Sequence, residues 1–107
     1  MTTAWYWRKG GRHHLHISGH AGYAAPGEDI VCAGISAIGY ALLGYLRNCP
    51  EAEDLRCAEE SGRMILSCGE HTKVNAAFEM AVIGLALIER QYPQHVHIYA
   101  DTPQSGG

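Results

Sequence analysis

The sequence lacks an excess of positive charge. Among its 107 residues, 8 are Lys or Arg and 11 are Asp or Glu, which gives a formal net charge of -3 with neutral histidines. Proteins that bind nucleic acid through its phosphates normally carry a basic face. We therefore expect no direct contact with nucleic acid.

Long apolar runs are also missing. The sequence contains no stretch of 18 consecutive apolar residues and no apolar signal-peptide core near its N-terminus. These absences predict no membrane association and a cytoplasmic location. In that compartment we expect reduced thiols rather than two disulfides for the four cysteines, which are Cys32, Cys49, Cys57 and Cys68.

The hydrophobic content of 47% suits a single core, and the short chain leaves little room for a second domain. Alternation and helical periodicity predict the α+β class, with the order ββαββαβ. The expected strands cover 3–8, 13–18, 55–60, 63–68 and 95–100, and the expected helices cover 29–48 and 73–91. The most economical arrangement is a mixed sheet with both helices packed on one face. We expect one domain over residues 1–101 and a flexible tail over 102–107.

The segment from Ser18 to Cys32 carries the most chemical information. His20 follows an alternating strand, and Cys32 lies near the expected start of a helix. With Asp29 as the N-cap or a first-turn residue, Cys32 falls in the first turn, where unpaired backbone N–H groups favour a thiolate. An imidazole can hold a thiolate as an ion pair and later protonate a leaving amine. This pattern predicts a thiol hydrolase with Cys32 as nucleophile and His20 as base.

Other residues of the same segment are candidates for supporting roles. Gly22 and Gly27 can turn the chain back toward the helix, and Ser36 lies one turn after Cys32 on the same face. The first-turn N–H groups, including that of Cys32, are candidate oxyanion donors. Asp29 either orients the histidine or is committed to capping the helix, and the pattern does not decide between these roles.

Seven histidines are many for a chain of this length. His14 and His16 share an expected strand face, as do His95 and His97, and each pair can chelate a metal. No carboxylate or cysteine lies close enough in sequence to complete a tetrahedral set. We therefore expect surface histidines, no metal site and no cofactor.

The amino-acid sequence of the histidine–cysteine segment is a more specific signal than the spacing of His20 and Cys32. It contains Gly19-His20-Ala21-Gly22-Tyr23-Ala24, then Gly27, Asp29-Ile30-Val31-Cys32-Ala33 and Ser36-Ala37. This sequence resembles the signature of the ribosomal-processing cysteine protease family (Prp, also called YsxB-like). A softer similarity covers 75–92, so the resemblance extends from about Gly19 to His97. The loop residues Ala25-Pro26 depart from the family pattern.

The resemblance implies a small α/β protein that forms a homodimer. It implies cleavage of the N-terminal extension of a large-subunit ribosomal protein, through an acyl-enzyme on a Cys32/His20 dyad. Ser36 and Asp29 match neighbouring motif positions and are possible supporting residues. We expect the glycine-rich loop to move and admit an extended substrate peptide, with its key positions at Gly19, Gly22, Tyr23 and Gly27.

Three alternatives stay open. A protease of this kind can act on a phage structural protein instead of a ribosomal one. A cysteine in an apolar helix is often only a small core residue, which fits a non-catalytic ribosome-associated binding module. The third alternative is a thiol redox or metal sensor built on Cys32, or on Cys68 and His71.

Overall fold

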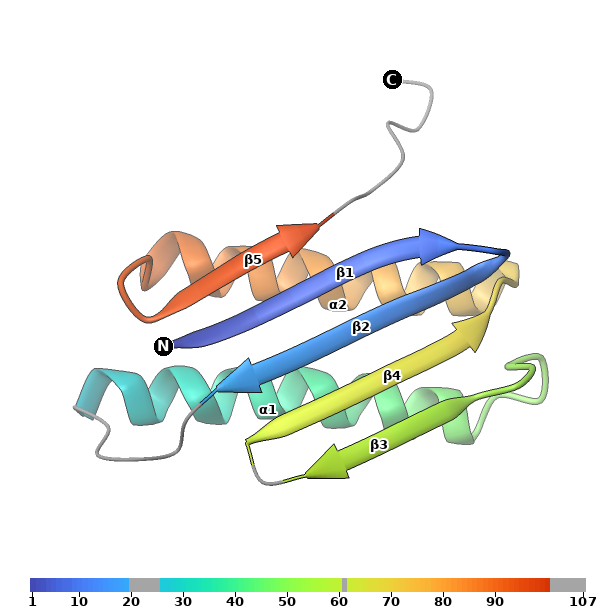
Figure 1. Ribbon diagram of the computed structural model, residues 1–107, viewed down its shortest axis with the longest axis horizontal. Helices are drawn as coiled ribbons and strands as arrows, with labels where there is room; N and C mark the ends of the chain where they lie inside the picture. Colours follow the sequence, from blue (N-terminus) through green and yellow to red (C-terminus); the bar gives the residue numbers. More distant parts are fainter. Residues whose placement is uncertain (20–25, 61, 101–107) are drawn as a thin grey trace, which may run out of the picture.

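The computed structural model describes residues 1–19, 26–60 and 62–100, with the side chains of all of these except 26–29. Its elements are β1 (Thr2–Lys9), β2 (Arg12–Gly19), α1 (Pro26–Arg47), β3 (Arg56–Glu60), β4 (Arg63–Gly69), α2 (Thr72–Gln91) and β5 (Val96–Ala100) (Figure 1). This order confirms the expected α+β class and the ββαββαβ sequence of elements. The division between a domain at 1–101 and a tail at 102–107 stays a prediction, because residues 101–107 lie outside the described ranges.

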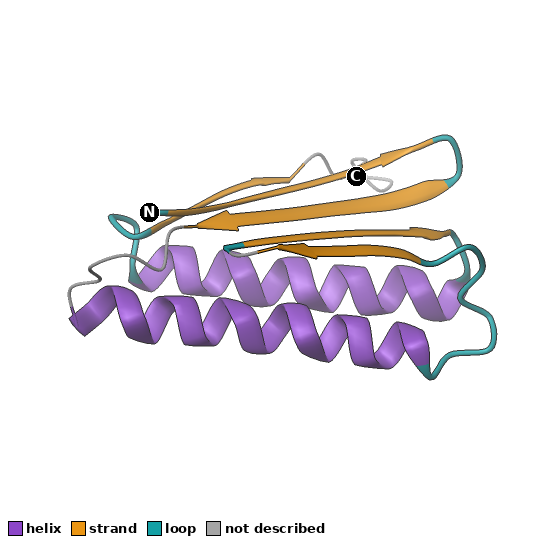
Figure 2. Ribbon diagram, turned by 60° about the horizontal axis from the view of Figure 1, so that its bottom comes forward, coloured by secondary structure: helices purple, strands orange, loops and turns teal. Residues whose placement is uncertain are grey.

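The five strands form one mixed sheet in the order β3-β4-β2-β1-β5. β1 and β5 are parallel, while the other neighbouring strands are antiparallel. Both helices cover the same face of the sheet, as expected (Figure 2). The first strand of the chain therefore lies inside the sheet, between β2 and β5.

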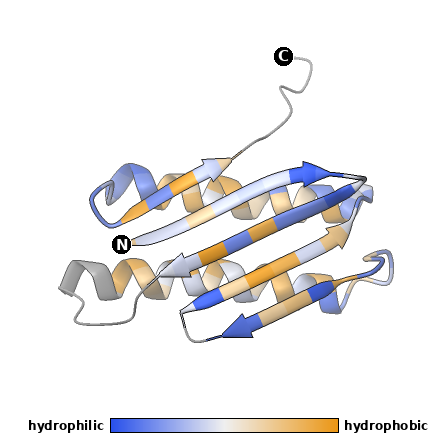
Figure 3. Ribbon diagram, viewed as in Figure 1, coloured by the Kyte–Doolittle hydropathy of each residue, from blue (hydrophilic) through white to orange (hydrophobic). Residues whose placement is uncertain are grey.

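The β1–β2 hairpin shows how local sequence sets the register. Gly10 and Gly11 have φ angles of 61° and 73°, which a two-residue hairpin turn of type I′ requires. Along β2, hydrophobic and hydrophilic residues alternate (Figure 3). Leu15 and Ile17 face the helices and are buried, whereas His14 and His16 lie on the opposite face.

The core lies between the sheet and the two helices. Each fully buried aliphatic or aromatic side chain contributes about 1.5–3 kcal/mol relative to an exposed one. The periodic apolar residues of both helices occupy this core, as their spacing predicted. They include Val31, Ile35, Leu42, Leu43 and Leu46 of α1, and Val74, Phe78, Ala81, Val82 and Leu85 of α2.

Among the described residues, one helical segment is long and apolar enough to cross a membrane by length and composition. It is Ile30–Arg47, in which small and polar residues interrupt the apolar ones. Core helices pass the same test, and this segment supplies Leu42, Leu43 and Leu46 to the core that it shares with the sheet. One face of the segment therefore packs into the core, while only 33% of its residues are buried.

The expected start of α1 at Asp29 was wrong. The helix begins at Pro26, so Asp29 lies within its first turn and is not the N-cap. Proline is favoured at the first helical position, because its fixed φ suits the helix and its missing N–H would have no partner there. This shift moves Cys32 out of the first turn.

Candidate active site

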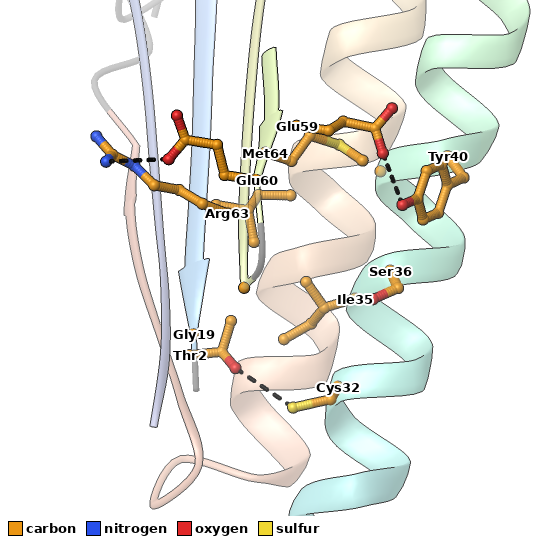
Figure 4. Close-up of a pocket in the computed structure, with 13 residues that line it drawn as sticks. Thr2, Gly19, Cys32, Ile35, Ser36, Tyr40, Glu59, Glu60, Arg63 and Met64 are labelled. Carbon is orange, nitrogen blue, oxygen red and sulfur yellow. Dashed lines mark hydrogen bonds and ion pairs between the residues drawn. The ribbon is translucent and has the colours of Figure 1, made fainter. Parts of the chain in front are cut away.

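Cys32 lies in the second turn of α1, on the side that faces the start of β1. Its side chain is half-buried, and its Sγ atom lies 3.7 Å from Oγ1 of Thr2. Figure 4 shows the two side chains pointing toward each other at one end of a cavity. The thiol is therefore in contact with a hydroxyl and still partly open to solvent.

The position at which α1 starts decides which of its backbone N–H groups are free to bind an oxyanion. In an α-helix only the first four N–H groups lack a partner within the helix. In α1, which begins at Pro26, these groups all precede Ile30, so the N–H of Cys32 is not among them. The expectation that the Cys32 N–H serves as a first-turn oxyanion donor is therefore wrong.

A cavity of about 170 Å³ opens beside the thiol, between α1 and the neighbouring ends of the strands. Its apolar wall includes Ile17, Ile35 and Met64. Ser36, one helical turn after Cys32, also lines it, in agreement with the i, i+4 spacing. The cavity offers an apolar surface next to a nucleophilic atom.

The opposite end of this cavity is polar. The hydroxyl of Tyr40 donates a hydrogen bond of 2.8 Å to Oε2 of Glu59. This hydrogen bond and the negative charge of Glu59 raise the pKa of Tyr40 above its ordinary value. Glu60 and Arg63 also line the cavity and form an ion pair of 4.0 Å. The cavity thus has a thiol at one end and a carboxylate at the other.

Gly19 brings the end of β2 close to the same place. It is the register partner of Thr2, and its N–H donates to the carbonyl of Gly62 at 2.9 Å. A Cβ at Gly19 would lie 2.5 Å from Oγ1 of Thr2, which leaves no room for a larger residue. The end of β2 therefore lies beside Thr2 and the cavity.

The structure brings together three of the predicted site residues, Cys32, Ser36 and Gly19, which line one cavity. His20, Gly22 and Tyr23 lie outside the described residues. Gly27 and Asp29 lie in the first turn of α1, and their side chains are also outside the description. The pairing of His20 with Cys32 therefore stays a prediction.

Thr2 was missing from the sequence interpretation. It lies near one end of the chain and carries no motif, so no local pattern associates it with Cys32. The contact arises because β1 lies inside the sheet, where its first residue faces α1. Such a contact depends on strand order, which the local pattern did not specify.

Cys68 and His71, considered above as a sensor pair, form hydrogen bonds with other groups. Sγ of Cys68 donates to the carbonyl of Glu53 at 3.6 Å, and Nδ1 of His71 accepts the N–H of Lys73 as the N-cap of α2. Within residues 1–19, 26–60 and 62–100, no group of three or more His, Cys, Asp or Glu residues could hold a metal ion.

The four cysteines are free thiols in different surroundings. Cys49 and Cys68 are buried, and Cys57 is exposed on the edge strand β3. Desolvation raises the pKa of both Cys57 and Cys68 above the ordinary value, which disfavours their thiolates. Cys32 differs from these three in lining the cavity described above.

Comparisons with known proteins find a matching family model and similar folds. A family model described as cysteine protease Prp matches residues 1–97. No curated protein matches the chain. The structure of SMU.848 from Streptococcus mutans is 25% identical, with a TM-score of 0.75 and coverage of 96% of each chain.

Two further structures are of the essential ribosomal processing protease Prp from S. aureus. The complex with a covalently linked product peptide is 20% identical, and the complex with a substrate peptide is 17% identical. Both have a TM-score of 0.76 and cover 94% of this chain and 100% of that one. At this identity they establish the shared fold.

Proposed function

Since the chain belongs to the Prp family of cysteine proteases, we propose that it is an endopeptidase that removes the N-terminal extension of a large-subunit ribosomal protein. The observation that carries the proposal is the family match over residues 1–97, within which the half-exposed Cys32 lines a cavity. The S. aureus Prp structures with substrate and product peptides support a peptide as the substrate.

In the proposed mechanism Cys32 is the nucleophile and His20 moves the proton. The thiolate sulfur attacks the scissile carbonyl carbon, and the protonated imidazole then gives its proton to the leaving amine as the C–N bond breaks. Water next attacks the thioester, with His20 as general base. The products are one peptide with a free amine and one with a carboxylate, and the thiolate and protonated imidazole are regenerated, so the cycle needs no cofactor.

Supporting roles belong to the same proposal. Ser36 lines the cavity with Cys32 and can donate a hydrogen bond to a substrate carbonyl there. The glycine-rich loop, with Gly22 and Tyr23, admits the extended peptide, and Asp29 orients the imidazole.

The proposal includes a cytoplasmic location and a homodimer. A groove of about 420 Å³ between the helices supports the dimer, because most of the residues that line it are apolar. We call this the helix groove, formed by Ile38, Ala41, Tyr45, Ala76 and Met80 among others. Exposed apolar patches of this kind mark contact surfaces.

The decisive experiment is cleavage of the source organism's own extended ribosomal protein, followed by intact mass. Wild type should remove one N-terminal segment, and Cys32→Ser and His20→Ala should leave the substrate intact. Cys57→Ser is the matched control, because it removes an exposed thiol that does not line the cavity.

The other outcomes separate the alternatives. Binding of the ribosomal protein by folded wild type without any cleavage would identify a binding module. Cleavage of a phage structural protein, with the ribosomal protein left intact, would move the assignment to that substrate. Cleavage that persists in Cys32→Ser would contradict the assignment of Cys32 as the nucleophile.

A further inference from the structure

Thr2 places a buried hydroxyl against the thiol of Cys32. The residue is 4% exposed, and among the described residues the hydrogen-bond partner of Oγ1 is Sγ of Cys32, at 3.7 Å. Either atom can donate in this pair. The contact joins the first residue of β1 to the second turn of α1.

The strength of this hydrogen bond depends on the charge of the sulfur. A neutral thiol is a weak acceptor, so a buried hydroxyl gains little from donating to it. A thiolate is a charged acceptor, and hydrogen bonds to charged groups are roughly twice as strong as neutral ones. A hydroxyl held here therefore favours the thiolate over the thiol.

The backbone holds Thr2 in this position from both sides. Its N–H donates to the carbonyl of His95 at 2.9 Å, and its register partners are Gly19 on β2 and Val96 on β5. Gly19 also packs against the Thr2 side chain, so closely that a Cβ there would meet it. The hydroxyl is consequently fixed before any substrate arrives.

We propose that Thr2 is a positioning residue that holds the Cys32 sulfur and stabilises its thiolate through a hydrogen bond from Oγ1. The inference rests on the proposed role of Cys32 as nucleophile. It assigns a function to a residue outside the histidine–cysteine segment, at the start of the first strand.

The test is the pH profile of Cys32 alkylation by iodoacetamide, measured by peptide mass spectrometry on the full chain. Thr2→Val keeps the shape of the side chain and removes the hydroxyl, and Thr2→Ser keeps the hydroxyl. Thr3→Val is the matched control, because Thr3 points to the other face of the sheet. Cys57, an exposed thiol of the same chain, is the internal reference.

We expect alkylation of Cys32 near neutral pH to slow roughly tenfold in Thr2→Val, because the sulfur loses its hydrogen-bond donor. Thr2→Ser and Thr3→Val should keep the wild-type profile. If Thr2→Val does not fold, Thr2→Ala against Thr2→Ser gives the same comparison, because these two differ by one oxygen atom.

Two results would overturn the inference in distinguishable ways. If Cys32 of wild type reacts faster than Cys57 but its profile is the same in Thr2→Val or Thr2→Ala, Thr2 has no positioning role and the nucleophile stands. If Cys32 of wild type reacts no faster than Cys57, the activated nucleophile and the role of Thr2 both fail.

Discussion

The Tyr6 hydroxyl donates a hydrogen bond of 2.6 Å to Nδ1 of the buried His13, on the adjacent strand. The other ring nitrogen, Nε2, lies 2.6 Å from Oδ1 of Asn75, which also accepts the N–H of His71. Because an amide oxygen only accepts, Nε2 carries the proton and Nδ1 is the acceptor. The ring of Phe78 stacks on His13 at 4.5 Å, so one neutral histidine connects β1, β2 and α2.

This connection predicts a loss of stability in mild acid. Burial lowers the pKa of His13 below the ordinary value of 6.5, against the opposing effect of the hydrogen bond to Asn75. Around pH 6.5 the unfolded chain binds a proton that the folded protein does not yet bind. The free energy of unfolding therefore falls as the pH drops from 6.5 toward the folded pKa, by at most about 1.4 kcal/mol per pH unit from this group.

Urea unfolding between about pH 7.5 and pH 5 measures this effect. His13→Gln is the comparison, because its amide can accept from Tyr6 and donate to Asn75 but does not titrate. Its stability should depend less on pH than that of wild type in this window. Equal pH dependence in the two proteins would contradict a titrating His13.

Removal of the Tyr6 hydroxyl should destabilise the fold. In Tyr6→Phe the buried Nδ1 of His13 loses its donor, which costs about 1–3 kcal/mol. Tyr99→Phe makes the same chemical change at a residue that is 53% exposed, where the expected change is within about 0.5 kcal/mol. Chemical denaturation of both variants tests the difference, and equal stabilities would show that the hydrogen bond is not important.

Two glycine substitutions should have opposite effects. Gly19→Ala places a Cβ 2.5 Å from Oγ1 of Thr2, and overpacking of this kind costs about 1–3 kcal/mol. Gly44→Ala, in the last turn of α1 with no atom of another element within 4 Å of the new Cβ, should stabilise by up to about 1 kcal/mol. Thermal unfolding measures the direction of the stability change in each variant. A neutral Gly19→Ala would mean that Thr2 can move away at no cost.

A charge in the helix groove should dissociate the proposed homodimer. Met80 lines the groove and is 72% exposed, so Met80→Glu adds a carboxylate without disturbing the core. Sedimentation should show a dimer for wild type and a monomer for Met80→Glu. Tyr99→Glu, on the open face of the sheet, is the control. Dissociation by Tyr99→Glu instead would show that the dimer interface lies on the open face of the sheet. A monomeric wild type would contradict the proposed dimer.

The order of elements was predictable because the signals for it are local. Two adjacent glycines mark the first hairpin, and alternation along β2 separates the Leu15 and Ile17 face from the His14 and His16 face. His13 shares the buried face by the same alternation, yet only its contact with Asn75 of α2 reveals its partner. Part of the site was also local, since the spacing of Cys32 and Ser36 predicts a shared helix face.

The start of α1 shows how one local signal can mask another. Asp29 fits a cap, which favoured a late start, while Pro26 is itself a signal for the first helical residue. Giving proline more weight would have placed Cys32 correctly in the second turn. The contact with Thr2 had no such signal, because it depends on the position of β1 between β2 and β5.

The parallel pairing of β1 with β5 also has a consequence for synthesis on the ribosome. Thr2 is made before either helix, but its N–H bonds the carbonyl of His95, which is made only after both helices. Until then β1 is an edge strand held by β2 alone. Closing so long a loop is slow compared with forming a hairpin or a helix. The hydroxyl beside Cys32 is therefore anchored late, so a nascent or truncated chain carries the cysteine before the pocket around it is complete.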